Sequence, residues 1–473
     1  MTDQFSVLLI HTPYLSVYGR GKKSFGSNFP LGIAYLSAYL SKHGFQTYCI
    51  DPEAQSISNE QIIKKIEELK PNLVGISAVT YSFRNAINLA KTIKEHFPEI
   101  HIVSGGAHVS ADYKNILQKV PWMDFLVHGE GEITLLELCR RLANSESVRG
   151  IKGLAWRNGG EIVIEESRPA ILDMDLLPFP DRESLPLHLY RPNPQMSIGR
   201  FSASMITSRG CPYHCVFCSS HTTLGRRVRA HSAEYVLEEI EYVKKKHNVE
   251  HIAFKDDTIA VDKERLRKIC NGMIERKLVM PWTANTTVST VNYELLKLMR
   301  SAGCFCLLFG IESGDETVMK NMGKGITKDQ CRKAVKYAKE LGIRVICSFI
   351  FGLPGETRES AEKTIQFAIE LSPHVAEFFM MIPYPGSAAY EMCHTNSEIP
   401  YEDFGHSLME PVSLISGMTK DEMKTLVKSA YKRFYMRPSQ LFQMAKNIRS
   451  LNELKVYWDG GMTILKGFKK NVR

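Results

Sequence analysis

The chain has 473 residues, which is too long for one ordinary domain, so we expect two or three domains. With 44% hydrophobic and 23% charged residues, the composition is that of a globular protein and excludes disorder, collagen and coiled coil as dominant features. A net charge of +9 is mild for this length, and no block of five or six like charges indicates a nucleic-acid-binding arm.

Nothing in the sequence indicates a membrane span or an export signal. No apolar run reaches the roughly 18 residues that span a bilayer, and residues 1–10 lack a basic region and a small-residue cleavage site. We therefore expect a cytoplasmic protein, in which the eleven cysteines are thiols or ligands rather than disulfides.

Short apolar runs alternate with amphipathic segments over the first 145 residues. The sequence predicts strands at residues 5–10, 47–50, 73–76, 100–103 and 125–128. Helices are predicted between several of them, at residues 31–43, 60–69 and 84–96. Strands spaced by helices of this length favour a Rossmann-like, doubly wound parallel sheet. Ligands bind beyond the carboxyl ends of such strands, which is where the Gly-rich and polar turns of this sequence fall.

A proline-rich stretch separates this series from a second one. Six of the 21 prolines lie between residues 169 and 194, which favours an extended linker. Beyond the linker, strands are predicted at residues 204–208, 251–255, 282–287, 306–312, 345–351 and 377–382. Six β/α repeats over about 190 residues favour a partial (β/α)6 barrel rather than a complete eight-stranded one.

The predicted organisation is α/β and has four parts. A Rossmann-like domain occupies residues 1–146, a Pro-rich linker 147–199, the partial barrel 200–390 and a small helical C-terminal region 391–473. The last part is predicted from helical patterns at residues 420–434 and 438–449.

Cys211, Cys215 and Cys218 form a C-x3-C-x2-C motif just past the first strand of the second series. Three thiolates within eight residues can hold one face of a compact iron–sulfur cluster. A four-iron cluster would then keep one iron without a protein ligand, free to bind a substrate or cofactor. The alternative is a structural zinc with His214 as a further ligand, although zinc sites usually combine two separated pairs of ligands.

The motif and the segments after it resemble the radical S-adenosylmethionine (SAM) superfamily. The further matches are F-K-D-D at residues 254–257, G-I-E-S-G at 310–314, F-I-F-G-L-P-G-E-T at 349–357 and P-Y-P-G at 383–386. They follow in the order expected of that family. The resemblance implies a [4Fe-4S] cluster on the three cysteines, SAM on the fourth iron and a 5′-deoxyadenosyl radical. It also implies a set of SAM contacts: Phe217, Asp257, Glu312, Ser313, Ser348, Gly352 and Pro383.

Elementary chemistry supports some of these contacts. Glu312 ends an apolar strand, where a carboxylate is costly unless it meets polar or charged groups of a ligand. The competing interpretation pairs Glu312 with an arginine such as Arg344. Gly352 and Gly355 lack a Cβ and would let the backbone approach a flat base closely.

The N-terminal series resembles the cobalamin-binding domain that many radical SAM enzymes carry. The match rests on N-F-P-L-G-I-A-Y-L-S-A-Y-L at residues 28–40, a serine after the third strand, and the Gly-rich loops at 105–108 and 128–132. The resemblance implies a set of cobalamin contacts: Ser77, Gly105, Gly106, His108, Gly129 and Glu130.

One departure from that family concerns the cobalt ligand. Many cobalamin domains place a histidine on cobalt through D-x-H-x-x-G after the first strand, but residues 9–14 lack both the Asp and the Gly. We therefore predict that His11 is a turn residue and that no protein histidine ligates cobalt.

The two resemblances together imply a cobalamin-dependent radical SAM methyltransferase. It would methylate an unactivated carbon or phosphorus of a small-molecule metabolite, by way of the 5′-deoxyadenosyl radical and methylcobalamin. Its partners would be that substrate and an external one-electron reductant, flavodoxin- or ferredoxin-like. Neither a membrane nor a nucleic acid is predicted as a partner.

Three other functions compete with this one. A non-methylating oxidative or ring-forming enzyme, resembling the anaerobic porphyrin cyclase, would use the same two domains. A tRNA-modifying methylthiotransferase would need three further cluster cysteines in its first domain, but only Cys49 and Cys139 precede residue 200. A non-enzymatic cobalamin sensor would not need the three-cysteine loop.

Overall fold

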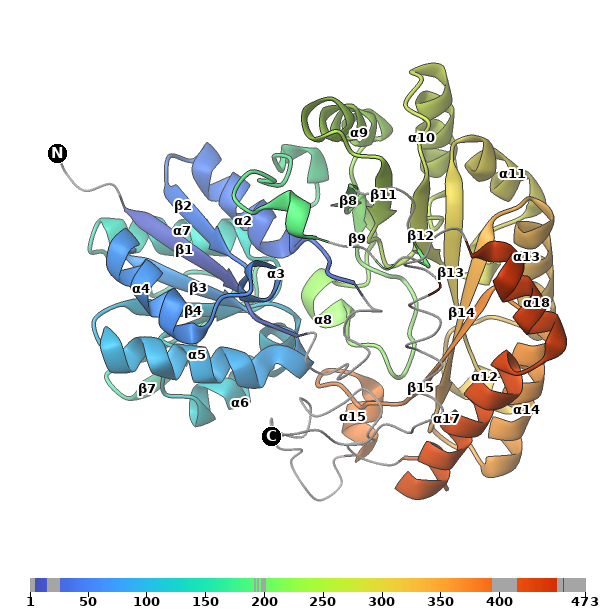
Figure 1. The fold of residues 1–473 in the computed structure, drawn as a ribbon. Coiled ribbons are helices and arrows are strands. Elements are labelled where there is room, and N and C mark those ends of the chain that lie inside the picture. The colour runs from blue at the N-terminus through green and yellow to red at the C-terminus, as the bar shows by residue number, and fades with distance from the viewer. Residues whose placement is uncertain are drawn as a thin grey trace.

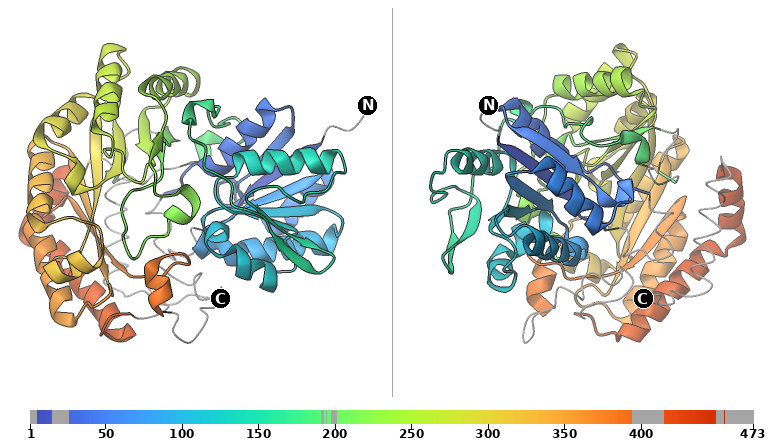
Figure 2. Two further views of the ribbon diagram at one scale, coloured as in Figure 1. Left: turned by 180° about the vertical axis from the view of Figure 1, so that it is seen from behind. Right: turned by 60° about the vertical axis from the view of Figure 1, so that its left-hand side comes forward.

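The structure is a computed structural model that describes residues 5–14, 26–190, 193, 195–196, 201–393, 415–448 and 454. Figure 1 shows two α/β units beside each other, the N-terminal one in blue to teal and the second in green to red. The short helix α8 (His221–Leu224) lies between them. The two views in Figure 2 also show the units side by side.

The N-terminal unit is built on a sheet of seven strands, counted over the described residues, in the order β2-β1-β3-β4-β5-β6-β7. The strands are β1 (Ser6–His11), β2 (Gln46–Ile50), β3 (Leu73–Ser77), β4 (His101–Gly105), β5 (Phe125–Val127), β6 (Leu154–Asn158) and β7 (Glu161–Ile164). The first five pair in parallel, and β6 and β7 add antiparallel neighbours at one edge. Parallel strands buried on both faces account for the continuous apolar runs in the sequence.

Helices cover both faces of this sheet. On one face, α2 (Leu31–Lys42) and α7 (Glu132–Ala143) enclose a core with alternate strand residues. On the other face lie α4 (Asn59–Leu69), α5 (Phe83–His96) and α6 (Ala107–Lys119), which enclose a second core. The short α3 (Pro52–Gln55) follows β2. The predicted Rossmann-like, doubly wound sheet is confirmed.

The sheet extends further along the chain than the sequence predicted. β6 and β7 form a hairpin around Gly159 and Gly160, which both have positive φ, inside the range 147–199 predicted as linker. A Gly-Gly pair between two short strands is a known hairpin signal. The extended stretch of the linker therefore begins after Ile164 rather than at residue 147.

The second unit is a sheet of six parallel strands, within the described residues, in the order β15-β14-β13-β12-β11-β8. They are β8 (Ser202–Met205), β11 (His251–Phe254), β12 (Trp282–Thr286), β13 (Cys304–Glu312), β14 (Arg344–Phe351) and β15 (Val375–Met380). The end strands β8 and β15 do not pair with each other in the described chain, so the barrel is open. The predicted partial (β/α)6 barrel is confirmed.

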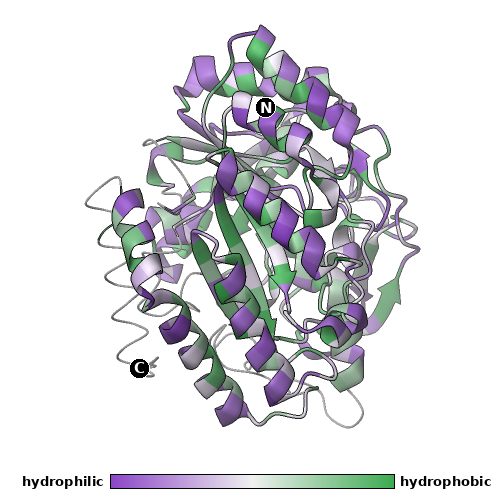
Figure 3. Ribbon diagram, turned by 90° about the vertical axis from the view of Figure 1, so that its right-hand side faces the viewer, coloured by the Kyte–Doolittle hydropathy of each residue, from purple (hydrophilic) through white to green (hydrophobic). Residues whose placement is uncertain are grey.

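Helices cover the outer face of the barrel sheet. They are α9 (Ala233–His247), α10 (Lys263–Glu275), α11 (Tyr293–Ser301), α12 (Glu316–Asn321), α13 (Lys328–Glu340), α14 (Arg358–Leu371), α17 (Lys420–Tyr435) and α18 (Pro438–Asn447). The short α15 (Ala388–Cys393) instead lies beyond the carboxyl end of β15 (Figure 1), where the Ala389 amide donates to the Val216 carbonyl at 2.8 Å. Capping boxes start α13, α14 and α17, where Thr327, Thr357 and Thr419 satisfy amides of the first turn. Figure 3 shows apolar strands behind helices whose outward faces are largely hydrophilic.

Alternate residues of each barrel strand point to opposite sides of the sheet. Phe349 and Phe378 belong to the outer core beneath the helices. Their neighbours therefore face inward, where Gly310, Ser348 and Glu377 lie side by side in register on β13, β14 and β15. We call these three the inner row. Ligands of β/α barrels bind near the carboxyl ends of the strands, so the inner row is close to the expected site.

Candidate functional site

The cysteine loop, residues 210–228, is closed at its base by a two-stranded hairpin. β9 (Ser208–Arg209) precedes the loop and pairs in antiparallel fashion with β10 (Arg229–Ala230), which follows it. Within the loop, the Cys218 amide donates to the Cys215 carbonyl at 3.1 Å, and the Cys211 amide donates to the Gly225 carbonyl at 3.3 Å. These bonds hold the three cysteines of the motif in one compact turn.

The three motif cysteines are more exposed than most cysteines of the chain. Cys211, Cys215 and Cys218 are partly exposed, as is Cys393, whereas the remaining seven are buried. Burial raises the pKa of Cys215 to about 12 and also raises that of Cys211, while the nearby ammonium of Lys324 lowers both. Thiols of this kind give up their protons when they bind metal. Three free, accessible thiols in one loop fit the ligand set of an iron–sulfur cluster.

Ligand geometry differs between a cluster and a single ion. Within the described residues, no three side chains of His, Cys, Asp or Glu gather around a position for one metal ion. The thiolates of a four-iron cluster each ligate a different iron, so they need no common centre.

Glu312 lies at the mouth end of β13 in an uncommon backbone conformation. The strand register shifts between Gly310 and Glu312, and Glu312 has a φ of +68°, in the left-handed region. This conformation costs about 1 kcal/mol for a residue with a Cβ, and such strain gathers at functional sites. It brings the carboxylate over Gly310, where a Cβ would collide with Glu312 Oε1.

Lys324 completes this arrangement. Its ammonium donates to Glu312 Oε1 at 2.6 Å and to the Gly310 carbonyl at 2.7 Å. The other carboxylate oxygen, Oε2, is buried and has no hydrogen-bond partner among the residues that the structure describes. Such an oxygen is costly unless a ligand donates to it. Arg344, the partner named in the competing interpretation, donates instead to the Gln195 carbonyl at 3.0 Å. Glu312 is therefore ion-paired, as that interpretation held, but with Lys324 rather than with an arginine.

Ser348 and Glu377 continue the inner row across β14 and β15. Both are partly exposed, and burial raises the pKa of Glu377 to about 7. A carboxyl group that titrates near neutral pH can accept or donate a proton under ordinary conditions. Glu377 was not among the residues predicted from the sequence, although an acidic residue inside the apolar segment V-A-E-F-F-M was an available signal.

The other four predicted SAM contacts differ in burial and in hydrogen bonding. Phe217 is half-buried and packs against the barrel core. The Asp257 carboxylate accepts a hydrogen bond from Ser220 Oγ at 3.1 Å, just beyond the third cysteine, and burial raises its pKa. Ser313 and Pro383 are buried within the protein. Their contacts with SAM stay predictions.

Gly352 meets protein on the side where a Cβ would point. Its φ is +91°, and a Cβ there would lie 2.8 Å from the sulfur of Met423 on α17. Its amide donates to Glu356 Oε2 at 2.5 Å, and burial raises the pKa of Glu356 to about 8. The need for glycine at this position is therefore explained by α17, whether or not a base also approaches it.

The predicted cobalamin contacts gather at the carboxyl ends of β3, β4 and β5. Ser77 and Gly105 end β3 and β4 in register with each other. Gly106 has a φ of +106°, and a Cβ there would lie 2.5 Å from the carbonyl oxygen of Ala78, so only glycine lets these two loops meet. Gly129, with a φ of +85°, faces open space.

Two of these residues have side chains that other protein groups engage. His108 is fully buried, packs against Phe83 and contacts Thr80 Oγ1 through Nδ1 at 3.2 Å. Burial lowers its pKa to about 3. The Glu130 carboxylate accepts hydrogen bonds from Arg209 and Arg229 of the second unit. A direct cobalamin contact by either side chain stays a prediction.

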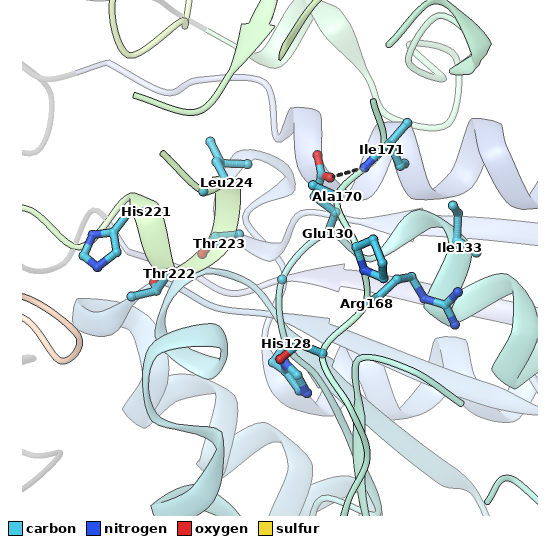
Figure 4. A pocket seen from close by; sticks show the side chains of 14 residues that line it. His128, Glu130, Ile133, Arg168, Ala170, Ile171, His221, Thr222, Thr223 and Leu224 are labelled. Atoms are coloured by element: carbon cyan, nitrogen blue, oxygen red, sulfur yellow. Dashed lines mark hydrogen bonds between the residues drawn. The ribbon is translucent and has the colours of Figure 1, made fainter. Parts of the chain in front are cut away.

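A pocket of about 190 Å³ lies between the two units, as Figure 4 shows. The loop after β5 forms one wall, with His128 and Glu130, and α8 forms the opposite wall, with His221 and Thr222. The Ile171 amide closes a third side by donating to Glu130 Oε2 at 2.9 Å. The pocket thus joins a predicted cobalamin loop to the helix that follows the third cysteine.

Comparison with known proteins assigns the chain to a family. The family model of the Radical SAM superfamily matches residues 205–368, and that of the B12 binding domain matches residues 21–139. An uncharacterized methyltransferase of Pyrococcus horikoshii is 34% identical over 462 residues, which cover 96% of this chain and 98% of that protein. The chain belongs to the radical SAM enzymes that carry a B12-binding domain.

Two further proteins are similar over most of this B12-binding radical SAM enzyme. The anaerobic magnesium-protoporphyrin IX monomethyl ester cyclase of Rubrivivax gelatinosus is 30% identical over 442 residues, 91% of this chain and 77% of that protein. The solved structure of the radical SAM methyltransferase TsrM from Kitasatospora setae, with cobalamin and a [4Fe-4S] cluster bound, has a TM-score of 0.71. It covers 98% of both chains at 15% sequence identity, which shows that the fold is shared.

These matches agree with the cofactors predicted from the sequence. The B12-binding model falls on the unit predicted to hold cobalamin, and the radical SAM model falls on the unit predicted to hold the [4Fe-4S] cluster and SAM. Across the described part of the chain, no helix combines the length and apolarity needed to cross a membrane.

Besides Glu377, the sequence did not point to the roles of Lys324, Arg209 and Glu132. Lys324 stands in G-K-G beyond β13, Arg209 directly precedes G-C in the cysteine motif, and Glu132 ends G-E-G-E after β5. A charged residue beside glycine was the available signal in each case. A single sequence does not reveal which of these loops meet.

Proposed function

We propose that this enzyme is a cobalamin-dependent methyltransferase that acts on an unactivated carbon or phosphorus of a small molecule. The observation that carries the proposal is the buried Glu312 Oε2, which lacks a hydrogen-bond partner in the described chain, on the same barrel as three accessible thiols. A B12-type domain contacts the other side of the cysteine loop.

In this proposal each group of the chain has a defined task. The three motif cysteines hold a [4Fe-4S] cluster, and Glu312 Oε2 accepts a hydrogen bond from SAM while Lys324 keeps the carboxylate oriented. Ser348 and Glu377 of the inner row face the space left for ligands. When bound, the cluster and SAM supply a 5′-deoxyadenosyl radical and cobalamin supplies a methyl carrier.

The proposal also includes domain boundaries, an electron donor and a cellular location. The cobalamin-binding domain would run to residue 164, the barrel from 200 to 390 and the helical region from 391. The electron that starts the reaction would come from an external flavodoxin- or ferredoxin-like reductant. We propose a cytoplasmic location, where the thiols stay reduced.

A second candidate function is oxidative or ring-forming rather than methylating. It is favoured by the 30% identity to a porphyrin ester cyclase over 91% of this chain. Glu377, whose pKa is raised by burial to about 7, could take up the proton that an oxidative reaction releases.

Product analysis of the reconstituted enzyme separates the two candidates. The chain is loaded anaerobically with iron, sulfide and hydroxocobalamin, then incubated with SAM, a low-potential reductant and a cell extract as the source of substrate. A methyltransferase forms both S-adenosylhomocysteine and 5′-deoxyadenosine, whereas the second candidate forms 5′-deoxyadenosine alone. The variant with all three motif cysteines changed to alanine should form no 5′-deoxyadenosine. Failure of the wild type to bind cobalamin would contradict the methyltransferase proposal.

A further inference from the structure

Four buried charged side chains join the cysteine loop to the N-terminal unit. Arg209 donates to Glu130 Oε1 at 2.8 Å through Nη1 and to Glu132 Oε1 at 2.6 Å through Nη2. Arg229 Nη1 donates to Glu130 Oε2 at 2.6 Å. All four side chains are only 3% to 7% exposed. We call Arg209, Arg229, Glu130 and Glu132 the latch.

The two arginines of the latch stand at the two ends of the cysteine loop. Arg209 on β9 is the register partner of Arg229 on β10, so Glu130 accepts one arginine from each strand of the hairpin. The base of the loop is tight, because a Cβ at Gly210 would collide with the Arg227 carbonyl oxygen. A single carboxylate of the B12-type domain therefore fixes both strands from which the loop emerges.

Further contacts fix the orientation of the latch side chains. Glu130 and Glu132 lie where β5 passes into α7, and Glu130 Oε2 also accepts from the Ile171 amide at 2.9 Å. The Arg209 guanidinium lies over the ring of Tyr35 from α2, 5.4 Å from its centre. Charge-assisted hydrogen bonds at low exposure are among the stronger polar contacts in proteins. Removing one partner strands a buried charge and costs more than the pair itself contributes.

The loop is also fastened to the barrel, on a different side. The Val216 amide donates to the Met322 carbonyl at 3.0 Å. Thr222 of α8 packs at Gly386 of the P-Y-P-G segment, where Ala111 of α6 from the N-terminal unit also approaches. The cysteine loop is thus held between both units, and the latch is its charged attachment to the B12-type domain.

We propose that the latch is a positioning device, in which Glu130 and Glu132 hold the cysteine loop against the B12-binding domain and so set the spacing between the cluster site and the cobalamin site. This inference rests on the proposed function, because that function assigns a cofactor to each unit. A reaction that combines groups held at two sites depends on their spacing, and an error of about 1 Å can cost about a hundredfold in rate. In this role Glu130 acts through the two arginines.

Hydrogen exchange of the cofactor-free chain, read by mass spectrometry, tests the latch without any cofactor. Glu130→Gln keeps the shape of the side chain and removes the charge that both arginines share. Amides of residues 210–228 should then exchange about tenfold faster or more. Glu132→Gln, which affects Arg209 alone, should give a smaller increase in the same peptides.

A matched control is a buried ion pair outside the latch. Arg182 and Glu239 are 0% and 1% exposed and 2.7 Å apart, and Glu239 lies on α9 of the barrel. Glu239→Gln should leave exchange at residues 210–228 unchanged. The proposal is overturned if Glu130→Gln leaves that exchange unchanged, or if Glu239→Gln raises it equally. Should Glu130→Gln fail to fold, as judged by circular dichroism, Glu132→Gln decides by the same criterion.

A second comparison adds hydroxocobalamin to the same proteins. In the wild type, binding should slow exchange in the N-terminal unit and also at residues 210–228. In Glu130→Gln, the slowing in the N-terminal unit should persist while the slowing in the loop is lost. Slowing of the loop that survives in Glu130→Gln would overturn the proposal. A wild type that binds no cobalamin would refute the proposed function, and the cofactor-free comparison would still decide on the latch.

Discussion

Replacing Lys324 with methionine removes the cation beside Glu312 and keeps the apolar stem of the side chain. The two side chains are 12% and 6% exposed, and Nζ lies 2.6 Å from Oε1. Breaking a buried pair by removing one partner costs about 3–5 kcal/mol, because the other charge stays buried without compensation. We expect a loss near the lower end, about 3 kcal/mol at pH 7.5, since Lys324 keeps some contact with water. Burial lowers the pKa of Lys324, but Glu312 and the nearby thiols of Cys215 and Cys331 together raise it more, so the wild-type lysine stays charged at pH 7.5.

Urea unfolding of the cofactor-free chain at pH 7.5, followed by pulse proteolysis, measures this free energy. Lys336→Met is the matched control, because Lys336 and Glu340 are 70% and 48% exposed, and it should change stability by less than about 0.5 kcal/mol. Adding Glu312→Gln to Lys324→Met should restore stability by removing the stranded charge. A loss no larger than that of the control would contradict this picture of the pair.

Four other predictions concern the cofactor sites and the residues around them. Changing Cys211, Cys215 and Cys218 together to alanine should reduce the iron bound after reconstitution from about four per chain to almost none, and iron that remains in a colorimetric assay would show that other ligands hold it. Glu312→Gln should weaken SAM binding about tenfold or more in equilibrium dialysis at unchanged iron content, whereas an unaltered affinity would remove the role proposed for Oε2. Because burial lowers the pKa of His108 to about 3, its neutral ring stabilises the fold fully above about pH 6.5, and that stabilisation is lost as the pH falls toward 3. The urea midpoint of His108→Gln should therefore fall less between pH 7 and about pH 4.5 than that of the wild type, and equal falls would contradict this. His11→Ala and His108→Ala should each leave the visible spectrum of bound cobalamin unchanged, and a shift in either would identify a cobalt ligand.

The sequence was sufficient to predict both sheets because buried parallel strands are local signals. The predicted strand 345–351 and the observed β14, Arg344–Phe351, differ by one residue, since an unbroken apolar run can be recognised without knowing its neighbours. The hairpin of β6 and β7 was missed for the opposite reason. Its strands have five and four residues of mixed polarity at a sheet edge, where only part of each strand needs to be apolar.

Partners across the fold could not be predicted in the same way. The sequence showed that the Glu312 carboxylate needed a partner, but it favoured a ligand or Arg344 rather than Lys324, twelve residues further on. Glu130 resembled a cofactor contact because glycines flank it, yet it binds Arg209, 79 residues away. Such pairs depend on strand order and on how two units meet, which no local pattern contains.

Whether this enzyme moves a methyl group from SAM to cobalamin can be measured before any substrate is known. The reconstituted chain is incubated with methyl-deuterated SAM, hydroxocobalamin and a low-potential reductant. The mass of the recovered cobalamin is then measured by mass spectrometry. We predict that it carries a deuterated methyl group, with an equal amount of S-adenosylhomocysteine in solution. Cobalamin without deuterium, alongside 5′-deoxyadenosine, would contradict the methyltransferase function and favour the oxidative one.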